Sequence, residues 1–546
     1  MRCTLAQLNP TIGDIDGNAA QIEAAIASAT SAGSDLVVTS ELAMLGYPPR
    51  DLLLRDGVAK RCLAEVERIA RRCTSLAALV GFPQPWPNGP RPYRNAVAFC
   101  RHGAVEAVYA KRLLPTYDVF DEDRYFTPGD RPLVVDVGGE RVGVLVCEDL
   151  WKADDAGAPR GYLSDPVGET LAAGATTLAI LSASPFVVGK DAKHRQRLLE
   201  LARRGVRVVA VNQAGGNDDL VFDGRSRAYA TGGPLVARLA PFDADVRTAS
   251  LDGAAVDEPA TDPLDEIVAA LVTGIRDYFR KTGHTHAILG LSGGIDSALV
   301  ATLATMALGT KVRGVLMPSR FSSQGSIDDA RESVRRLKLF DSIAPIRAAH
   351  EIVSASLAES FGPIDGVADE NMQSRLRGLF LMAASNKFGG LVLSTGNKSE
   401  LAVGYATLYG DMAGALAPIG DVLKTTVWDI ARHLNQHHRR YGFDEEPIPR
   451  SSIEKPPSAE LRPDQTDQDT LPPYEQLDAI VEARIEREQS VESIVASTSL
   501  DPAVVRRWCR AIDLAQYKRD QAAIILKISP RCFGRGRPMP IASRGD

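Results

Sequence analysis

Three residues with complementary chemistry each follow an apolar run in the first half of the chain. Glu41 follows DLVVTS, Lys111 follows AVEAVYA, and Cys147 lies within VGVLVCEDLW. A cysteine thiol has an unperturbed pKa of about 8.5, so it needs a base to become a thiolate and a cation to stabilise the charge that develops. The trio therefore predicts a nucleophile with its base and its cation. Taken singly, each has a plainer interpretation as a packed cysteine or a solvated charge.

A second candidate site lies in the stretch AILGLSGGIDSALVATLATMALG. Its pattern predicts a strand over Ala287–Gly290, a loop over Ser292–Ser297 and then a helix, which is how chains build phosphate-binding loops. The loop lacks the lysine with which a Walker loop serves γ-phosphoryl transfer. Gly293 and Gly294 let backbone N–H groups converge on an anion, which suits pyrophosphate as a leaving group, and Asp296 is suited to hold magnesium. A chance helix cap is the alternative.

Elements that could position the first trio alternate along residues 1–253. Apolar β-rich runs such as LAALVGFP and VRVVAVNQAG are separated by amphipathic stretches over 18–32 and 59–72. This alternation predicts sheets covered by helices, that is, a layered α/β domain. Prolines and acidic residues then interrupt the pattern over 254–263, where we place a linker.

Residues 264–546 restart the alternation. A helix is predicted over 264–281, and further helices over 326–337 and 371–388 lie between short apolar strands. Strands and helices of this length indicate a parallel, Rossmann-like sheet. The stretch IEKPPSAELRPDQTDQDTLPPYEQ has no core of its own, so residues 455–474 are a candidate lid or a disordered connector. Two short helical segments and a basic tail follow.

Composition places the chain among ordinary globular proteins and excludes several classes. Its 546 residues are 45% hydrophobic and 24% charged with a formal charge of −6, which gives no reason to expect nucleic acid or a membrane as partner. The start has no signal-peptide pattern, so a cytoplasmic location is expected. The odd number of cysteines shows no C-x-x-C pair, which argues against a disulfide scaffold or a zinc site; they are Cys3, Cys62, Cys73, Cys100, Cys147, Cys509 and Cys532.

Three motifs in the first half resemble those of the nitrilase superfamily in its glutaminase-type branch: SELAMLGYPPRDLL, YAKRLLPTYDVFDEDRYFTPG and VLVCEDLW. The resemblance implies an α-β-β-α sandwich in which Glu41 is the general base, Cys147 the nucleophile and Lys111 the cation that stabilises the oxyanion. From the same pattern, with SASPFVVGK, we expect glutamine contacts from Tyr117, Glu122, Ser184 and Lys190. Ordinary polar loop residues are the alternative for these four.

The second half resembles another family. SGGIDS is similar to the signature of the ATP pyrophosphatases, and LMPSRFSSQGSIDDA, ENMQSRLRG and LSTGNKSELAVGYATLYGDMAGALAPIGDVLKT are similar to successive blocks of the NAD synthetases. The resemblance implies that ATP contacts Gly290, Leu291, Ser292, Gly293, Gly294, Ile295, Asp296, Ser297 and Thr395. It assigns Asn371, Glu400 and Lys518 to deamido-NAD, and Asp296 with Glu400 to Mg²⁺. Asp411 and Lys424 could face the nicotinate or phosphate end, with Lys424 as surface charge the alternative.

The two resemblances together imply an amide-forming enzyme. An amidase would release ammonia from glutamine, and a synthetase would adenylate the carboxylate of deamido-NAD with ATP, so that ammonia then gives NAD, AMP and pyrophosphate. Family members resembling the second half form dimers and fused forms build larger assemblies, so a homo-oligomer is expected. The competing hypotheses are another amidase-fused ATP pyrophosphatase that forms an amide, and a non-catalytic nucleotide-binding scaffold.

Overall fold

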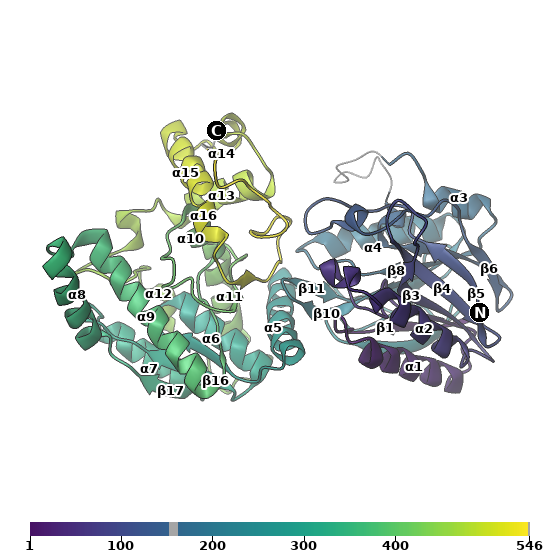
Figure 1. Cartoon of the computed structure of the whole chain (residues 1–546), viewed down its shortest axis with the longest axis horizontal. Coiled ribbons are helices and arrows are strands. Elements are labelled where there is room, and N and C mark those ends of the chain that lie inside the picture. Colours follow the sequence, from purple (N-terminus) through teal and green to yellow (C-terminus); the bar gives the residue numbers. More distant parts are fainter. Residues whose placement is uncertain (152–161, 544–546) are drawn as a thin grey trace. The chain divides into compact units, whose positions relative to one another are not determined.

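A computed structural model describes residues 1–151 and 162–543 and divides the chain into two compact units, Met1–Thr261 and Asp262–Asp546 (Figure 1). The predicted linker over 254–263 is largely part of the first unit. The Val256 N–H donates to the carbonyl of Leu235 at 2.8 Å, and Glu258 forms an ion pair with Arg227 at 2.6 Å. The second unit begins at Asp262, whose carboxylate caps the following helix.

The first unit contains two six-stranded mixed sheets. In order across the first sheet the strands are β14 (Asp245–Ser250), β1 (Arg2–Gln7), β2 (Leu36–Val38), β3 (Ala77–Pro85), β4 (Tyr93–Arg101) and β5 (Ala104–Ala110). The second sheet has β13 (Leu235–Arg238), β12 (Arg227–Tyr229), β9 (Arg207–Asn212), β8 (Thr177–Ser182), β7 (Glu140–Val146) and β6 (Val134–Val137). A separate hairpin joins β10 (Ala214–Asn217) to β11 (Leu220–Asp223).

Helices cover the outer faces of these sheets, as Figure 1 shows. The helices α1 (Ile15–Ser31) and α2 (Val58–Ala70) pack on the first sheet, and α3 (Pro166–Ala172) and α4 (Lys190–Arg203) pack on the second. Side chains of both sheets, among them Leu5, Val97 and Val209, share one fully buried core. The unit is thus an α-β-β-α sandwich, which confirms the predicted fold class.

The second unit is built on a parallel sheet of four strands. Their order is β17 (Phe340–Ile343), β16 (Val312–Leu316), β15 (Ala287–Gly290) and β18 (Leu391–Val392). Helix α5 (Pro263–Thr282) leads into β15, and helices α6 (Ile295–Leu308), α7 (Gln324–Leu337), α8 (Arg347–Phe361) and α9 (Gly366–Phe388) connect the strands. The chain moves outward from β15 through β17 and returns to the other edge of β15. Such a switch point is where open parallel sheets bind ligands, at the carboxyl ends of their strands.

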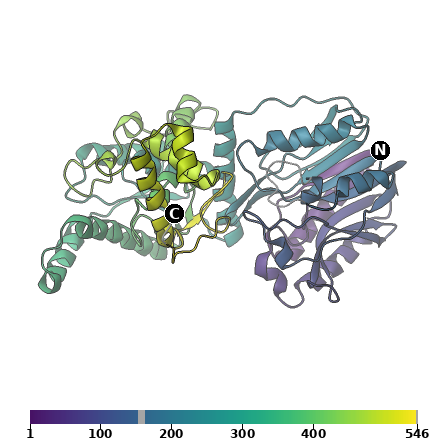
Figure 2. The same ribbon diagram turned by 90° about the horizontal axis from the view of Figure 1, so that it is seen from above.

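The rest of the second unit is helical. The helices are α10 (Lys398–Val403), α11 (Lys424–Gln436), α12 (Arg450–Glu454), α13 (Tyr474–Val481), α14 (Val491–Thr498), α15 (Pro502–Leu514) and α16 (Gln516–Arg519), and β19 (Leu416–Ala417) pairs with β20 (Ile524–Ile525). Figure 2 shows the C-terminal helices grouped together, and they share an apolar core with α10. The sequence predicted only two short helical segments here. In the described part of the chain no helix is long and apolar enough to cross a membrane.

Candidate active sites

The first site lies where three strands of the first unit end. Glu41 comes shortly after β2, Lys111 directly after β5 and Cys147 directly after β7. The ammonium of Lys111 donates to Oε1 of Glu41 at 2.7 Å, and Cys147 interacts electrostatically with both. Glu41 and Lys111 are each 1% exposed and Cys147 is 9% exposed. The structure therefore brings the predicted trio together in a buried site.

A second carboxylate joins this trio. Glu122 accepts from the Lys111 ammonium at 2.8 Å and from the hydroxyl of Tyr47 at 2.9 Å. Burial opposes the charge on Lys111, but Glu122 and Glu41 outweigh it and raise the pKa of the ammonium well above its usual value. Burial raises the pKa of Glu122 to about 7. The charge of Lys111 opposes this rise, and the nearby carboxylate of Glu41 adds to it. Lys111 is therefore a fixed cation between two carboxylates.

Further hydrogen bonds fix Glu41 and the turn that carries Cys147. The backbone N–H of Ala183 donates to Oε2 of Glu41 at 2.9 Å, and the Asn95 amide donates to Oε1 at 2.7 Å. Asp149 accepts from the backbone N–H of Val146 at 3.0 Å, and it also accepts from the backbone N–H groups of Arg112 and Leu113, which follow β5. Sequence reasoning missed Asn95 and Asp149, since their roles depend on residues remote in the chain.

The backbone at Cys147 adopts an uncommon conformation. The residue has φ +43° and opens a short 3₁₀ turn, Cys147–Leu150, at the end of β7. Burial, and after it Glu41, raises the pKa of the thiol well above its usual value, while Lys111 and Lys190 act in the opposite direction. The resting side chain is therefore a neutral thiol, and Glu41 is the base available to remove its proton. Non-glycine residues in this conformation are concentrated at functional sites.

The remaining predicted residues of the first site lie around this turn. The Tyr117 hydroxyl donates to the carboxylate of Glu148 at 3.1 Å, and the Tyr162 hydroxyl donates to it at 3.0 Å. Ser184 donates its backbone N–H to Asn212 at 2.8 Å, and Lys190 donates to the carbonyl of Pro185 at 3.2 Å. Glu148 is only 3% exposed and was not among the predicted residues, although it is the direct neighbour of the nucleophile.

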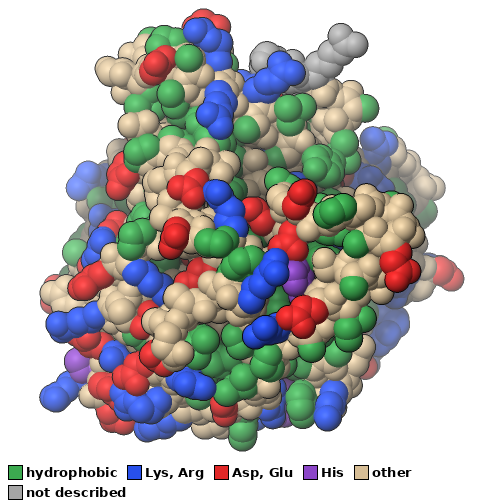
Figure 3. All heavy atoms as spheres, turned by 90° about the vertical axis from the view of Figure 1, so that its left-hand side faces the viewer, with side chains coloured by type: hydrophobic (Ala, Val, Ile, Leu, Met, Phe, Trp, Pro, Cys, Tyr) green, Lys and Arg blue, Asp and Glu red, His purple; other side chains and the backbone are tan. Residues whose placement is uncertain are grey.

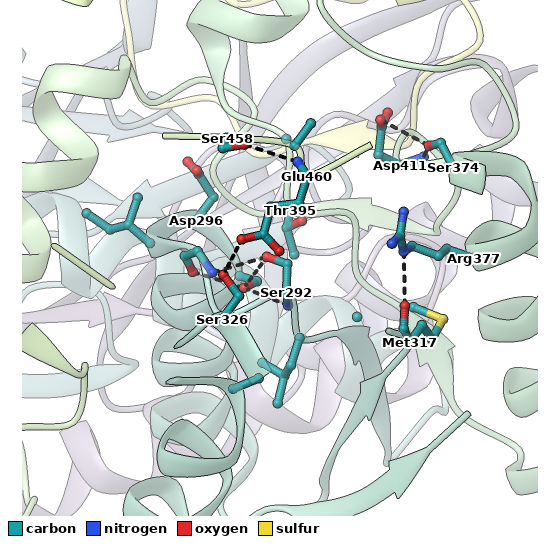
Figure 4. A pocket seen from close by; sticks show the side chains of 18 of the residues that line it. Ser292, Asp296, Met317, Ser326, Ser374, Arg377, Thr395, Asp411, Ser458 and Glu460 are labelled. Carbon is teal, nitrogen blue, oxygen red and sulfur yellow. Dashed lines mark hydrogen bonds between the residues drawn. The ribbon is translucent and has the colours of Figure 1, made fainter. Parts of the chain in front are cut away.

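The second site is a cavity of about 400 Å³ at the carboxyl end of β15 (Figure 4). Its wall includes the predicted residues Gly290, Leu291, Ser292, Gly294, Ile295, Asp296, Ser297, Thr395, Glu400, Asp411 and Lys424. Gly293 has φ +79°, and a Cβ there would lie 2.1 Å from the carbonyl oxygen of Ser326, so only glycine fits. Helix α6 begins at Ile295, so Asp296 and Ser297 lie in its first turn and not in the predicted loop.

Charged side chains meet on one side of this cavity. The Lys424 ammonium pairs with Asp296 and lies 3.6 Å from Oε1 of Glu400, while the Asn397 amide donates to Asp296 at 3.0 Å. Lys424 is 1% exposed, so its alternative as a surface charge is wrong. Burial raises the pKa of Glu400 to about 8, with Asp296 adding to the rise and Lys424 opposing it. Asp467 lines the same cavity, and burial raises its pKa as well.

The residues Asn371 and Lys518, both predicted to contact deamido-NAD, lie outside the cavity wall and brace the loop that carries Asp411. Asn371 accepts from the hydroxyl of Thr407 at 2.7 Å, and Lys518 donates to the carbonyls of Gly404 and Ala406, each at 2.7 Å. The backbone N–H of Thr407 in turn donates to Asp411 at 2.8 Å.

The structure also separates two neighbouring arginines of α9. Arg377 lines the cavity and donates to the carbonyl of Met317 at 3.2 Å, and burial lowers its pKa to about 10. Arg375 instead donates to the carbonyl of Leu408 at 3.2 Å and does not line the cavity. Of the two, Arg377 is the one placed to meet a ligand.

The candidate lid over 455–474 packs against the cavity and is not a structureless connector. Lys455, Ser458 and Glu460 line the cavity wall. The Glu460 carboxylate accepts from the backbone N–H of Ser323 at 3.1 Å and from the hydroxyl of Ser326 at 2.7 Å, at the start of α7 (Figure 4). Whether the segment opens stays a prediction.

Comparison with known proteins gives the class to which this pair of sites belongs. The family of carbon-nitrogen hydrolases matches residues 2–156, and the NAD synthase family matches residues 267–522. The chain thus joins a carbon-nitrogen hydrolase domain to an NAD synthase domain.

Relatives and solved structures with both domains identify the family. The chain is 42% identical to the glutamine-dependent NAD(+) synthetase of Synechocystis sp., with 98% of each chain covered, and 41% identical to that of Thermotoga maritima, with 100% of this chain and 99% of that one covered. The structure of the glutamine-dependent NAD+ synthetase from Acinetobacter baumannii in complex with adenosine diphosphate matches with a TM-score of 0.78 at 36% identity, and the match covers 100% of this chain and 98% of that one. This chain belongs to the glutamine-dependent NAD(+) synthetase family.

Proposed function

We propose that this protein converts deamido-NAD to NAD, with ATP as co-substrate and glutamine as the nitrogen donor. The observation that carries the proposal is the presence, in one chain of this family, of two complementary sites. One is a buried Glu41, Lys111 and Cys147 set, and the other is a nucleotide-sized cavity behind the SGGIDS loop. The first supplies ammonia and the second consumes it.

In the first site, Glu41 accepts the proton of the Cys147 thiol as the sulfur attacks the amide carbonyl of glutamine. Lys111 stabilises the negative charge that develops on the carbonyl oxygen, because it is a charged donor fixed in a buried place. The protonated Glu41 then gives this proton to the leaving nitrogen. Ammonia departs, and the glutamyl group stays bound to Cys147 as a thioester. Water activated by Glu41 then attacks the thioester, which releases glutamate and restores the thiol.

Recognition of glutamine needs a partner for its α-ammonium group, and we assign this role to Glu148. Its carboxylate is buried beside Cys147, and within the described residues it accepts hydrogen bonds from the hydroxyls of Tyr117 and Tyr162 rather than from a cationic group. A buried carboxylate is costly unless it is paired, so the site gains when an ammonium arrives.

In the second site, the nicotinate carboxylate attacks the α-phosphorus of ATP and pyrophosphate leaves as the new acyl-phosphate bond forms. The backbone N–H groups at the start of α6 and the hydroxyls of Ser292 and Ser297 hold the phosphates. Lys424 and Arg377 add positive charge on the cavity wall. Ammonia then attacks the carbonyl carbon of the adenylate, AMP leaves, and the nicotinamide amide of NAD is formed.

The carboxylates of this cavity fit a divalent cation. Asp296, Glu400 and Asp467 line one cavity, and burial together with the neighbouring carboxylates raises the pKa of Glu400 to about 8. Oxygen donors of this type suit Mg²⁺. When bound by Asp296 and Glu400, Mg²⁺ would neutralise charge on the phosphates of ATP.

Assembly into a homo-oligomer is supported by apolar side chains on the outside of the second unit. Ile352 and Phe361 of α8 and Val367 and Leu379 of α9 are 61–75% exposed. Figure 3 faces the side on which α8 lies, and hydrophobic side chains form patches there between charged groups. We propose that a second copy of the chain covers this surface, because exposed apolar patches mark association sites. Light scattering of wild type and the double variant Ile352→Asp, Phe361→Asp tests it, and an unchanged mass contradicts it.

The direct test of the function compares nitrogen donors in wild type and Cys147→Ala. We expect Cys147→Ala to lose glutamine-driven NAD formation by about 10⁴-fold or more, because the nucleophile is gone, and to keep ammonium-driven formation. The measurement is NAD formed from deamido-NAD and ATP with each donor. If wild type hydrolyses glutamine but makes no NAD with either donor, the second site serves another carboxylate.

A further inference from the structure

Two charged residues of the synthetase site, Glu400 and Lys424, come from helix starts that are separated by more than twenty residues of chain. Glu400 lies in the first turn of α10 and Lys424 is the first residue of α11. Neither helix is joined to the other by a sheet. One backbone hydrogen bond, from the Lys398 N–H to the carbonyl of Val422 at 2.9 Å, brings the two helix starts together, and side-chain contacts must fix their register.

The hydroxyl of Ser399 forms the first side-chain connection between the two helices. It accepts from the backbone N–H of Lys424 at 2.9 Å. Ser399, which precedes Glu400 in the chain, is therefore bonded to the backbone of Lys424, whose ammonium lies beside Glu400. A hydroxyl that accepts in this way must point its own proton elsewhere. That proton is donated to Asp478.

Asp478 of α13 completes the connection. Its Oδ1 accepts from the Ser399 hydroxyl, and its Oδ2 accepts from the backbone N–H of Thr425 at 2.9 Å and from the Thr425 hydroxyl at 2.8 Å. The side chain is 4% exposed, so water does not readily replace these bonds. One carboxylate therefore holds α10 through one oxygen and α11 through the other.

A second contact keeps α10 from turning independently of this link. The ammonium of Lys398 is buried and pairs with Asp421 at 2.9 Å, and it also donates to the hydroxyl of Ser529 at 2.7 Å. Lys398 and Ser399 thus anchor successive residues of α10 in different directions. Within α10 the Glu400 carboxylate also accepts from the backbone N–H of Asn397 at 3.3 Å, so what the Asp478 link adds is the position of this helix start relative to α11.

We propose that Asp478 is a positioning residue of the synthetase site, which sets the register between α10 and α11 and thereby the arrangement of Glu400, Lys424 and Asp296. The inference rests on the proposed function of that site. Asp478 itself does not line the cavity and is not expected to touch substrate.

The chemistry of the link requires a carboxylate. Among the described residues, the side-chain and backbone groups that hydrogen-bond to the Asp478 carboxylate all donate to it, and each of its two oxygens accepts at least one hydrogen bond. An asparagine has only one acceptor oxygen in its side chain, so either the Ser399 hydroxyl or the two donors of Thr425 lose their acceptor. Asp478→Asn is nearly the same size, so it changes the link without opening a cavity.

The test uses the full-length protein and ammonium-driven synthesis. The variants are Asp478→Asn, the double variant Ser399→Ala, Thr425→Val, and their combination. We expect Asp478→Asn to lower kcat about tenfold or more with a smaller change in the KM for ATP, since the ATP-binding loop is left intact. The double variant should cause a similar loss, and the combination little more than either alone, because all three side chains form one link.

Two controls separate positioning from general damage. Asp501→Ala removes the side-chain cap of α15, which packs against α13, and should leave kcat unchanged even if it lowers the melting temperature. Glutamine hydrolysis at Cys147 should be unchanged in every variant. An unchanged kcat in Asp478→Asn, losses that add in the combination, or an equal loss in Asp501→Ala each overturn the inference. If wild type itself makes no NAD from ammonium, the proposed function fails and the inference falls with it.

Discussion

The two sites hold a buried lysine between carboxylates, but they do so by different means. In the first unit, Lys111 lies between Glu41 and Glu122, and two of the three side chains come from strand ends of one sheet. In the second unit, Lys424 lies between Asp296 and Glu400, and these residues come from the starts of three separate helices. A sheet fixes its strand ends through backbone hydrogen bonds, whereas helix starts depend on side-chain contacts.

The largest expected effect comes from removing each lysine. Lys111→Met leaves two carboxylates without their cation in a site that is 1–3% exposed, so we expect loss of glutamine hydrolysis and of about 3–5 kcal/mol of unfolding free energy in the first unit. In Lys424→Met the carboxylates border a cavity that water can enter, so the loss of stability is smaller. Ammonium-driven synthesis should still fall about 10²–10³-fold.

Calorimetric unfolding and the two activity assays measure these losses. Each variant should keep the activity of the other site, so each serves as the control for its counterpart. Equal destabilisation by the two substitutions contradicts the comparison, because it means that both lysines are held in equally closed surroundings.

Substrate recognition in the first site gives the next effect. We expect Glu148→Gln to raise the KM for glutamine about 10–100-fold, because a charged hydrogen bond to the α-ammonium is replaced by a neutral one, and to change kcat less. Tyr117→Phe keeps the carboxylate and removes one hydroxyl donor, so its effect should be smaller. Steady-state glutamine hydrolysis measures both. A drop in kcat without a change in KM would show that Glu148 acts on the nucleophile and not on substrate recognition.

The second site should also make stability depend on pH. The pKa of Glu400 is about 8 in the folded chain against an ordinary value of 4.5, so the folded state binds more protons than the unfolded state between these values. Stability from this group is therefore present below about pH 4.5 and is lost as pH rises toward 8, at a slope of at most about 1.4 kcal/mol per pH unit.

Thermal unfolding of wild type and Glu400→Gln between pH 5 and 8, without added cation, measures this dependence. The glutamine variant should lose less stability over the range than wild type, because its side chain does not titrate. Parallel curves for the two proteins exclude Glu400 as the source of the slope.

Much of the first site could be predicted from sequence because its members follow recognisable strands. Glu41, Lys111 and Cys147 each end an apolar run, and strands of one layered domain bring such positions together. The contact between Glu122 and Lys111 could not be predicted in the same way. It depends on the path of the loop that follows β5, and no periodic pattern describes that path.

In the second site the sequence motif of the phosphate loop could be predicted, but the positions of the surrounding helices and side chains could be predicted less well. SGGIDS marked the phosphate loop, but α6 begins three residues earlier than expected, because Gly294 is extended and is the last residue before the helix. Helix α8 was not predicted at all. Asp478 and Glu460 carry no sequence signal, since their importance comes from Ser399 and Ser323, which lie elsewhere in the chain.

The smallest expected effect concerns the segment over 455–474, which closes the second site from one side. Glu460 holds it to the start of α7 through Ser323 and Ser326, and these bonds are partly exposed, so each contributes about 0.5–1.5 kcal/mol. Glu460→Gln should therefore speed proteolysis within the segment about 2–10-fold, and ATP with deamido-NAD should slow it again. Asp464→Asn, in the same segment, is the matched control and should be cleaved like wild type. If Glu460→Gln is cleaved no faster than this control, the carboxylate does not hold the segment closed. A faster cleavage that the substrates reverse would mean that loop contacts, unlike the strand ends of the first site, let this cavity open and close.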